Sequence, residues 1–188
     1  TVSTGTLSPA FSSSVLNYNV KVPYTTTSIT LTAAKNHATA TVSGDGAKTL
    51  VVGTNTFTIT VTAQNGEKKT YTVTVTRAAA SNDNTLKSLT VSTGTLSPSF
   101  SPAQLSYTVS VPYSVTSITI NAGANHSAAT VSGDIGKALS LDVGTKTFKI
   151  TVKAQDGTEK TYTVAVTREK CTDNTLKSLS VSGYKFTE

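Results

Sequence analysis

Thr54-Asn-Thr-Phe-Thr-Ile-Thr-Val-Thr-Ala-Gln-Asn-Gly-Glu-Lys-Lys-Thr-Tyr-Thr-Val-Thr-Val-Thr-Arg77 is the stretch that decides the fold. Polar and apolar residues alternate on both sides of Asn65-Gly66, which is the pattern of two half-buried strands. Asn-Gly tolerates the positive φ angles that tight hairpins need. The pattern returns as Thr145–Arg168 around Asp156-Gly157, so the sequence predicts one hairpin in two copies.

Repetition extends well beyond the hairpin. Residues 1–11 match residues 90–100, and residues 18–24 match residues 107–113. Most of the chain is therefore two copies of one unit, with a period of roughly 90 residues. Each copy is long enough to bury a modest core of its own.

Each copy contains about seven short alternating segments, and this spacing is typical of an immunoglobulin-like β-sandwich. The high Thr content favours strands, and we find no helical periodicity, so an all-β fold is expected. The first copy lacks the Asn-Thr-Leu-Lys-Ser-Leu that leads the first strand of the second. In the second copy the expected strands are Leu86–Ser92, Ser106–Val111, Ser117–Ala122, Ala129–Ser132, Leu139–Leu141, Thr147–Ala154 and Lys160–Arg168.

Alternation also predicts which side chains of the first copy face the core. Leu7 and Phe11 are expected to close one end of the sandwich. The inward residues expected on the strands are Tyr18, Val20, Val22, Ile29, Leu31, Ala33, Phe57, Ile59, Val61, Ala63, Tyr71, Val73 and Val75.

The predicted organisation is two sandwiches joined end to end by short linkers, which permit only limited swing. A third copy begins where Asp173-Asn-Thr-Leu-Lys-Ser-Leu repeats Asp83-Asn-Thr-Leu-Lys-Ser-Leu. The expected ranges are 1–77 for the first repeat without its leading half-strand, 78–85 for a linker, 86–168 for the second repeat, 169–175 for a linker and 176–188 for the start of a third.

Charge and composition exclude several classes of function. The net charge is +6, but the basic residues are dispersed and Lys68-Lys69 is the longest run, so no nucleic-acid groove is expected. Attraction to anionic cell-wall polymers is the functional alternative for this surface. No signal peptide or apolar membrane span occurs, so direct membrane insertion is not expected, and we interpret the sequence as a fragment of a longer protein. Cys171 is the single cysteine, which excludes an intrachain disulfide.

These motifs together resemble the bacterial cadherin-like β-sandwich domain. The resemblance covers both copies and is carried in the second by residues 86–102, 107–112, 117–120, 143–145, 150–152, 154–157 and 162–168. It implies tandem extracellular modules in large exported or wall-associated bacterial proteins, where adjacent repeats are the immediate partners. There such modules serve as spacers, adhesion modules or companions of carbohydrate-active enzymes. It brings no catalytic residues, so we expect a chain that is not an enzyme.

Calcium is the first ligand to consider, because cadherins stiffen their joints with it. Asp83 and Asp173 lie in the two expected linkers and are the candidate ligands. Calcium requires six to eight oxygen ligands, and each joint offers one carboxylate. The favoured interpretation is therefore that both are turn residues bonded to their own backbone, with no cofactor.

Sugar binding is the second alternative, since Tyr24 and Tyr113 each follow a strand-ending proline. An exposed aromatic face there could contact polysaccharide, a cell-wall polymer or a ligand on a host surface. The competing interpretation is that the rings cover an end of the core with their hydroxyl groups in water. His37 and His126 occupy equivalent loops, and neither has the partners that a zinc site or a catalytic triad needs.

The outward threonines of the hairpin form a regular array that is similar to the surface of ice-binding proteins. Lys149, Lys153 and Ala165 interrupt this array in the second copy, and a sandwich sheet is twisted rather than flat. Cross-strand pairing on a solvated face is the preferred interpretation.

We therefore expect a non-catalytic segment of a bacterial surface or secreted protein that acts as a stalk, spacer or adhesion module. A carbohydrate- or wall-polymer-binding accessory module is the first alternative. A second alternative rests on residues 174–182, which repeat the leading strand that the first copy lacks. They could complete the sandwich of a neighbouring molecule and give head-to-tail filaments by strand addition.

Overall fold

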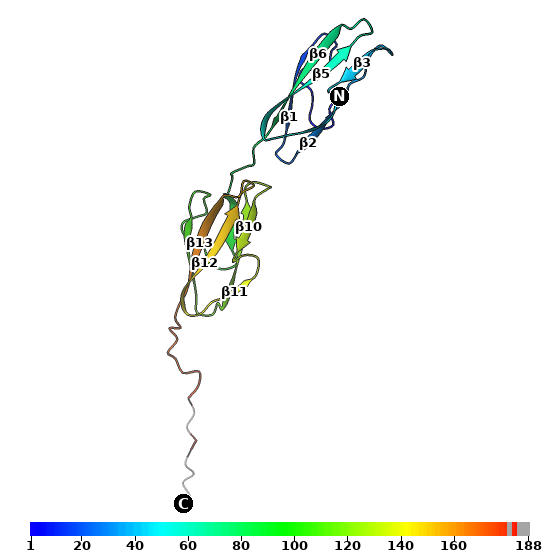
Figure 1. Cartoon of the computed structure of the whole chain (residues 1–188). Coiled ribbons are helices and arrows are strands. Elements are labelled where there is room, and N and C mark those ends of the chain that lie inside the picture. Colours follow the sequence, from blue (N-terminus) through cyan, green and yellow to red (C-terminus); the bar gives the residue numbers. More distant parts are fainter. Residues whose placement is uncertain (180–181, 184–188) are drawn as a thin grey trace, which may run out of the picture. The chain divides into compact units, whose positions relative to one another are not determined.

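The structure, a computed structural model, describes residues 1–179 and 182–183, and its described part contains strands and no helix (Figure 1). No helix in this part is therefore long and apolar enough to cross a membrane. The chain divides into two compact units, Thr1–Ala80 and Ser81–Glu188. The all-β prediction is confirmed.

The second unit is a sandwich of a four-stranded and a three-stranded sheet, ordered β10-β12-β13-β8 and β11-β9-β7. All pairs are antiparallel except β13 and β8, which run parallel. The strands are β7 Leu86–Val91, β8 Ser106–Val111, β9 Ser117–Ala124, β10 Thr130–Gly133, β11 Ala138–Ser140, β12 Gly144–Lys153 and β13 Glu159–Arg168. All seven predicted strands are confirmed, with shifts only at their ends.

The first unit repeats the four-stranded sheet as β1-β6-β5-β3, but its second sheet has only β2 and β4. Its strands are β1 Asn17–Val22, β2 Ser28–Leu31, β3 Thr41–Ser43, β4 Gly46–Thr49, β5 Gly53–Thr62 and β6 Lys68–Arg77. These six strands agree with the expectation of about seven for a copy that lacks its leading half-strand. A single bridge between Val2 and Leu31 stands where β7 pairs with β9 in the second unit.

Both predicted hairpins form, with a turn that differs in detail from the expected one. Gly66 donates to the Ala63 carbonyl at 3.0 Å, and Ala63 donates to Glu67 at 2.8 Å, which leaves three residues in the loop. Gly66 has φ +89°, and no residue other than glycine has a positive φ in the described part of the chain. The turn is thus the three-residue type with glycine at the left-handed position, and Asn65 keeps an ordinary backbone conformation.

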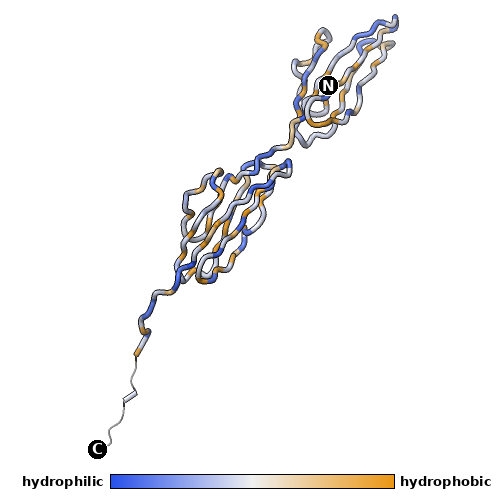
Figure 2. Tube along the Cα trace, turned by 60° about the vertical axis from the view of Figure 1, so that its left-hand side comes forward, coloured by the Kyte–Doolittle hydropathy of each residue, from blue (hydrophilic) through white to orange (hydrophobic). Residues whose placement is uncertain are grey.

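Each unit has its own apolar core between its two sheets, and residues of opposite hydropathy alternate along the strands (Figure 2). The inward faces are those that alternation predicts, with Val20, Val75, Val109 and Val166 almost fully buried. The core predictions fail at one edge of the first unit. The residues whose burial was predicted wrongly lie at the candidate site.

An open apolar groove as the candidate functional site

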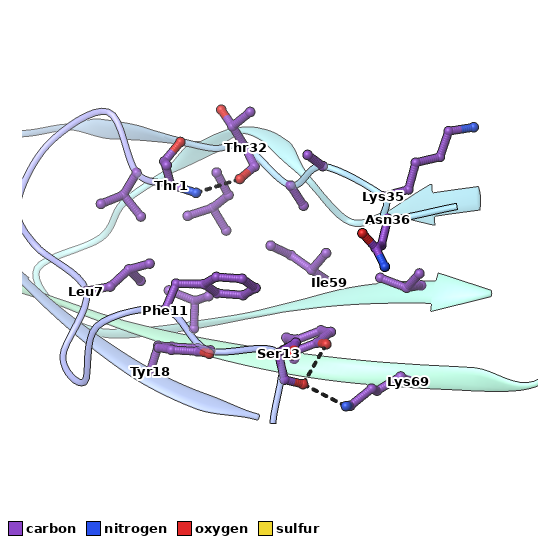
Figure 3. Close-up of a pocket in the computed structure, with 17 residues that line it drawn as sticks. Thr1, Leu7, Phe11, Ser13, Tyr18, Thr32, Lys35, Asn36, Ile59 and Lys69 are labelled. Atoms are coloured by element: carbon purple, nitrogen blue, oxygen red, sulfur yellow. Dashed lines mark hydrogen bonds between the residues drawn. The ribbon is translucent and has the colours of Figure 1, made fainter. Parts of the chain in front are cut away.

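The first unit has a groove along the edge of its core, with a volume of about 670 Å³. Its walls are strand residues that face inward in both sheets, together with the segment around Phe11. The apolar lining includes Leu7, Phe11, Leu31, Ile59, Val61 and Tyr71. Lys35, Asn36, Ser13 and Lys69 also line it, and Lys35 extends away from the apolar side chains (Figure 3).

Phe11 is the largest exposed apolar side chain here, at 67% exposure, although the sequence predicts that it closes the core. That prediction is wrong. Two of the predicted inward residues are also less covered than expected, since Val61 is half-buried and Ala63 is exposed. In the second unit the equivalent Val152 and Ala154 are buried, so the residue types are suited to burial. The segment that covers them in the second unit corresponds to positions before Thr1.

Leu86 and Leu89 supply that cover in the second unit. They are 0% and 2% exposed, and they belong to one core cluster with Tyr107, Ile150 and Tyr162. The first-unit equivalents of those three core residues are Tyr18, Ile59 and Tyr71, and all three line the groove. The groove is therefore the place that the first strand fills in a complete unit.

The tyrosine hydroxyl at this edge shows the same difference. In the second unit the backbone N–H of Leu86 donates to the Tyr162 hydroxyl at 3.1 Å, and that hydroxyl donates to the Pro102 carbonyl at 2.8 Å. The equivalent Tyr71 keeps only the second bond, donating to the Ser13 carbonyl at 3.1 Å (Figure 3). Burial raises the pKa of Tyr162, because water no longer solvates its phenolate.

The strand that borders the groove is also shorter. In the second unit β9 continues to Ala124, and its last five residues lie beside β7. The equivalent strand β2 ends at Leu31. Thr32 bonds to Thr1, and residues 33–35 pair with no strand in the described part of the chain. Thr1 lines the groove, and its amino nitrogen donates a hydrogen bond to the Thr32 carbonyl at 2.7 Å.

The two aspartates considered as candidate calcium ligands occupy local turns. Asp83 Oδ1 accepts bonds from the Thr85 N–H at 3.0 Å and the Thr85 hydroxyl at 2.6 Å, while its Oδ2 accepts from Asn125 at 2.8 Å. Asp173 accepts the same pair of bonds from Thr175. These bonds favour the carboxylate, led by the threonine hydroxyl in each case, and lower both pKa values. Asn125 is a partner that sequence reasoning missed.

Tyr24 and Tyr113 are each paired with the arginine that ends the hairpin. The Arg77 guanidinium lies 5.0 Å from the Tyr24 ring centroid, and the Arg168 guanidinium lies 4.8 Å from that of Tyr113. Each arginine also donates to the carbonyl of its tyrosine at 2.6 to 2.9 Å. Tyr113 is 47% exposed, with one face of its ring covered by the guanidinium.

The remaining candidate residues are the two histidines and the cysteine. His37 and His126 each accept or share a hydrogen bond within their own loops, and Cys171 is an exposed free thiol. Among the described residues, no three His, Cys, Asp or Glu side chains come together as a metal site. The threonines pair across the hairpins as expected, with Thr60 and Thr70 hydroxyl oxygens 3.4 Å apart.

Comparison with known families agrees with this geometry. The sequence model of the family described as "Cadherin-like beta sandwich domain" matches residues 1–78 and 86–169. The chain belongs to this cadherin-like family. The resemblance inferred from the motifs is confirmed, and the two matched segments correspond to two tandem domains.

A relative of this cadherin-like chain occurs in Evansella cellulosilytica, where it is named "Putative membrane protein". The two are 39% identical over 102 residues, which cover 50% of this chain and 15% of the relative. The chain thus spans a small part of that relative's length.

Solved structures with a similar fold include the extracellular domain of protocadherin gamma-B4, at 13% identity and a TM-score of 0.32, covering 82% of this chain and 32% of that one. The fibronectin(III)-like modules of Clostridium thermocellum CbhA match at 13% identity and a TM-score of 0.25, covering 90% of this chain and 94% of theirs.

Sequence reasoning found the absent Leu-Lys-Ser-Leu of the first cadherin-like domain but not the groove that results from it. The signal was the comparison of the two copies. Leu86 and Leu89 occupy inward positions of the first strand, so a copy without them must leave that part of its core open.

Proposed function

We propose that this chain is a non-catalytic repeat segment of a bacterial cell-surface or secreted protein and acts as a stalk or spacer that can carry adhesion modules. The observation that carries the proposal is that each unit has a core cluster of its own, built from equivalent residues. Repeated units that fold separately can be added in series without rebuilding an interface.

The partners of the candidate side chains support a structural role. The guanidinium of Arg168 joins the Tyr113 and Leu141 carbonyls, and Arg77 joins the equivalent pair in the first unit. Asp83 is bonded at both carboxylate oxygens. These side chains hold strand ends and turns together through hydrogen bonds. A ligand that bound to them would have to displace those hydrogen bonds.

The membership of the cadherin-like family and the named membrane protein among its relatives support a place outside the cytoplasm. The match covers 15% of that relative.

Polysaccharide retention tests the proposal. The 188-residue chain is incubated with insoluble cellulose and with purified peptidoglycan carrying its anionic wall polymers. We expect recovery in the supernatant at ordinary salt. Saturable retention that is lost in Tyr113→Ala and kept in the control Lys87→Ala would replace the spacer with the sugar-binding module.

A further inference from the structure

We propose that residues 81–86 form a force-bearing latch, which holds the entry end of the second unit together when the chain is pulled along its length. The proposal deepens the stalk function and rests on it for its biological use, because a stalk carries tension. All the contacts of the latch lie between residues 81 and 168. The head-to-tail alternative, which involves residues 174–182, stays a separate prediction, and its residues 180 and 181 lie outside the described residues.

The latch is bonded at both of its ends to the four-stranded sheet. The Ser81 N–H donates to Gln155 Oε1 at 3.0 Å, and the Ser81 carbonyl accepts from the Asp156 N–H at 3.0 Å, both in the turn between β12 and β13. At the other end, the Leu86 N–H donates to the Tyr162 hydroxyl of β13 at 3.1 Å. The latch therefore holds one sheet, although the strand that follows it, β7, belongs to the other sheet.

The middle of the latch is bonded to the three-stranded sheet. The Thr85 carbonyl accepts from the backbone N–H of Asn125, the residue after β9, at 2.9 Å. The Asn125 side-chain amide donates to Asp83 Oδ2 at 2.8 Å, and the charge of the carboxylate strengthens this bond. Asp83 Oδ1 also accepts from the Thr85 N–H and hydroxyl, which keeps the turn compact. Residues 81–86 thus join both sheets at one end of the sandwich.

The chain enters and leaves the second unit at opposite ends. Arg168, the last residue of β13, donates to the Leu141 carbonyl, and the Leu141 N–H donates to the Thr116 carbonyl just before β9. β9 therefore begins at the exit end and finishes beside Leu86 at the entry end. Because β7 is antiparallel to β9, both β7 and β13 run from entry to exit. Tension on the two ends of the unit therefore acts along these strands.

Of the two strands that receive this tension, β7 is held by fewer partners. It pairs with β9 alone, whereas β13 pairs with both β12 and β8. Separation of β7 from β9 would open the core, since Leu86 and Leu89 belong to the core cluster. The latch transmits the load from Ser81 directly to the β12–β13 turn, and β13 carries it to the exit. The bonds of the latch must therefore break before β7 carries the full load.

Constant-force measurements on the whole chain test the latch, with the handles attached to two thiols. Cys171 is an exposed free thiol just after β13, and Ala80→Cys places the second thiol just before Ser81. Lys87→Cys instead places it on β7, beyond the latch, at an exposed position. Neither pair of handles includes the first unit in the loaded path.

At the same force, the second unit should survive at least about tenfold longer when pulled from position 80 than from position 87, because the bonds of the latch must break first. Gln155→Ala/Asn125→Ala should remove this advantage and leave the lifetime from position 87 nearly unchanged. Asn82→Ala is the matched control, since this exposed side chain lies in the same segment, and it should behave like the parent chain.

Equal lifetimes from the two positions would overturn the proposal. So would equal shortening from both positions by Gln155→Ala/Asn125→Ala, because that result would report a general loss of stability, or an equal effect of Asn82→Ala. The stalk function fails by a different measurement, saturable retention on polysaccharide, which does not depend on lifetimes under load.

Discussion

Arg77 and Arg168 each hold two strand-end carbonyls with one planar side chain. Arg168 donates to Tyr113 at 2.7 Å and 2.9 Å and to Leu141 at 3.0 Å, so three N–H groups of one guanidinium are used. A lysine ammonium cannot span both carbonyls with the same geometry. The two arginines therefore fasten the ends of the strands, and they explain why the adjacent tyrosine rings are covered.

Arg168→Ala should lower the free energy of unfolding of the second unit by about 1.5–3 kcal/mol, because charge-assisted bonds to two carbonyls are lost. Arg168→Lys should recover only a small part. Urea unfolding, followed by resonances of each unit, measures both. Lys153→Ala is the control, since its ion pair with Glu159 is exposed and should contribute under about 1 kcal/mol. Full stability in Arg168→Ala would contradict this role.

The pKa of Tyr162 is raised by burial, so the folded second unit binds its phenolic proton more tightly than the unfolded chain does. Its contribution to stability is complete below the unfolded pKa of about 10 and is lost as the pH rises through the folded pKa. Urea unfolding between neutral pH and about pH 11 should show this decline. Tyr162→Phe should be less stable at neutral pH and should show a flatter decline. An unchanged slope in Tyr162→Phe would refute the assignment.

Calcium should leave the melting temperature unchanged, with EDTA giving the same value. Asp83 already receives three hydrogen bonds, and among the described residues no cluster of acidic side chains surrounds it. Calorimetry with and without about 10 mM calcium measures this, and that concentration exceeds the dissociation constants of extracellular calcium modules, which reach about 1 mM. A rise in melting temperature that Asp83→Asn abolishes would establish a calcium site.

At the scale of single elements, the two copies separate what alternation can predict from what it cannot. Alternation correctly gives the inward face of β5 and β6, because side chains of a strand must point to opposite faces. It does not report whether that face is covered. Val61 and Val152 stand at equivalent places, yet only Val152 is buried, in a core cluster that includes Leu86 and Leu89 of β7. Whether the inward face of a strand is covered thus depends on another strand, and in the second unit that strand, β7, lies far before Val152 in the sequence.

Sequence reasoning about individual sites has the same limit. It identified Asp83 as a turn residue, but Asn125, its partner 42 positions away, follows only from the fold. It placed Tyr24 and Tyr113 correctly after β1 and β8, yet the covering arginines come from β6 and β13. Local patterns predict elements and turns, whereas contacts between distant elements require the arrangement of the sheets.

Phe11→Ala and Phe100→Ala form a matched pair for the difference between the units. Phe100 is half-buried and packs against the closed core, so its removal should cost about 2 kcal/mol. Phe11 is mostly exposed beside the groove, and its removal should cost under about 1 kcal/mol. Urea unfolding of both variants measures the two costs, and equal costs would show that the groove is closed in solution.

At the scale of the whole molecule, two units with separate cores should unfold as separate events. This behaviour suits a spacer, because the failure of one repeat leaves its neighbour intact. Separate unfolding also allows the free energy of unfolding of the first unit, with its open groove, to be compared with that of the closed second unit in the same chain and under the same conditions.

The most direct test of this account compares the unfolding of the chain with that of the version carrying Leu-Lys-Ser-Leu before Thr1. At concentrations where both are monomeric, the added strand should stabilise the first unit by about 2–5 kcal/mol, the range for burying leucine in a core, and leave the second unit unchanged. Changing both added leucines to alanine should remove the gain. A first unit whose stability does not respond to the added leucines would contradict the conclusion that its core is open.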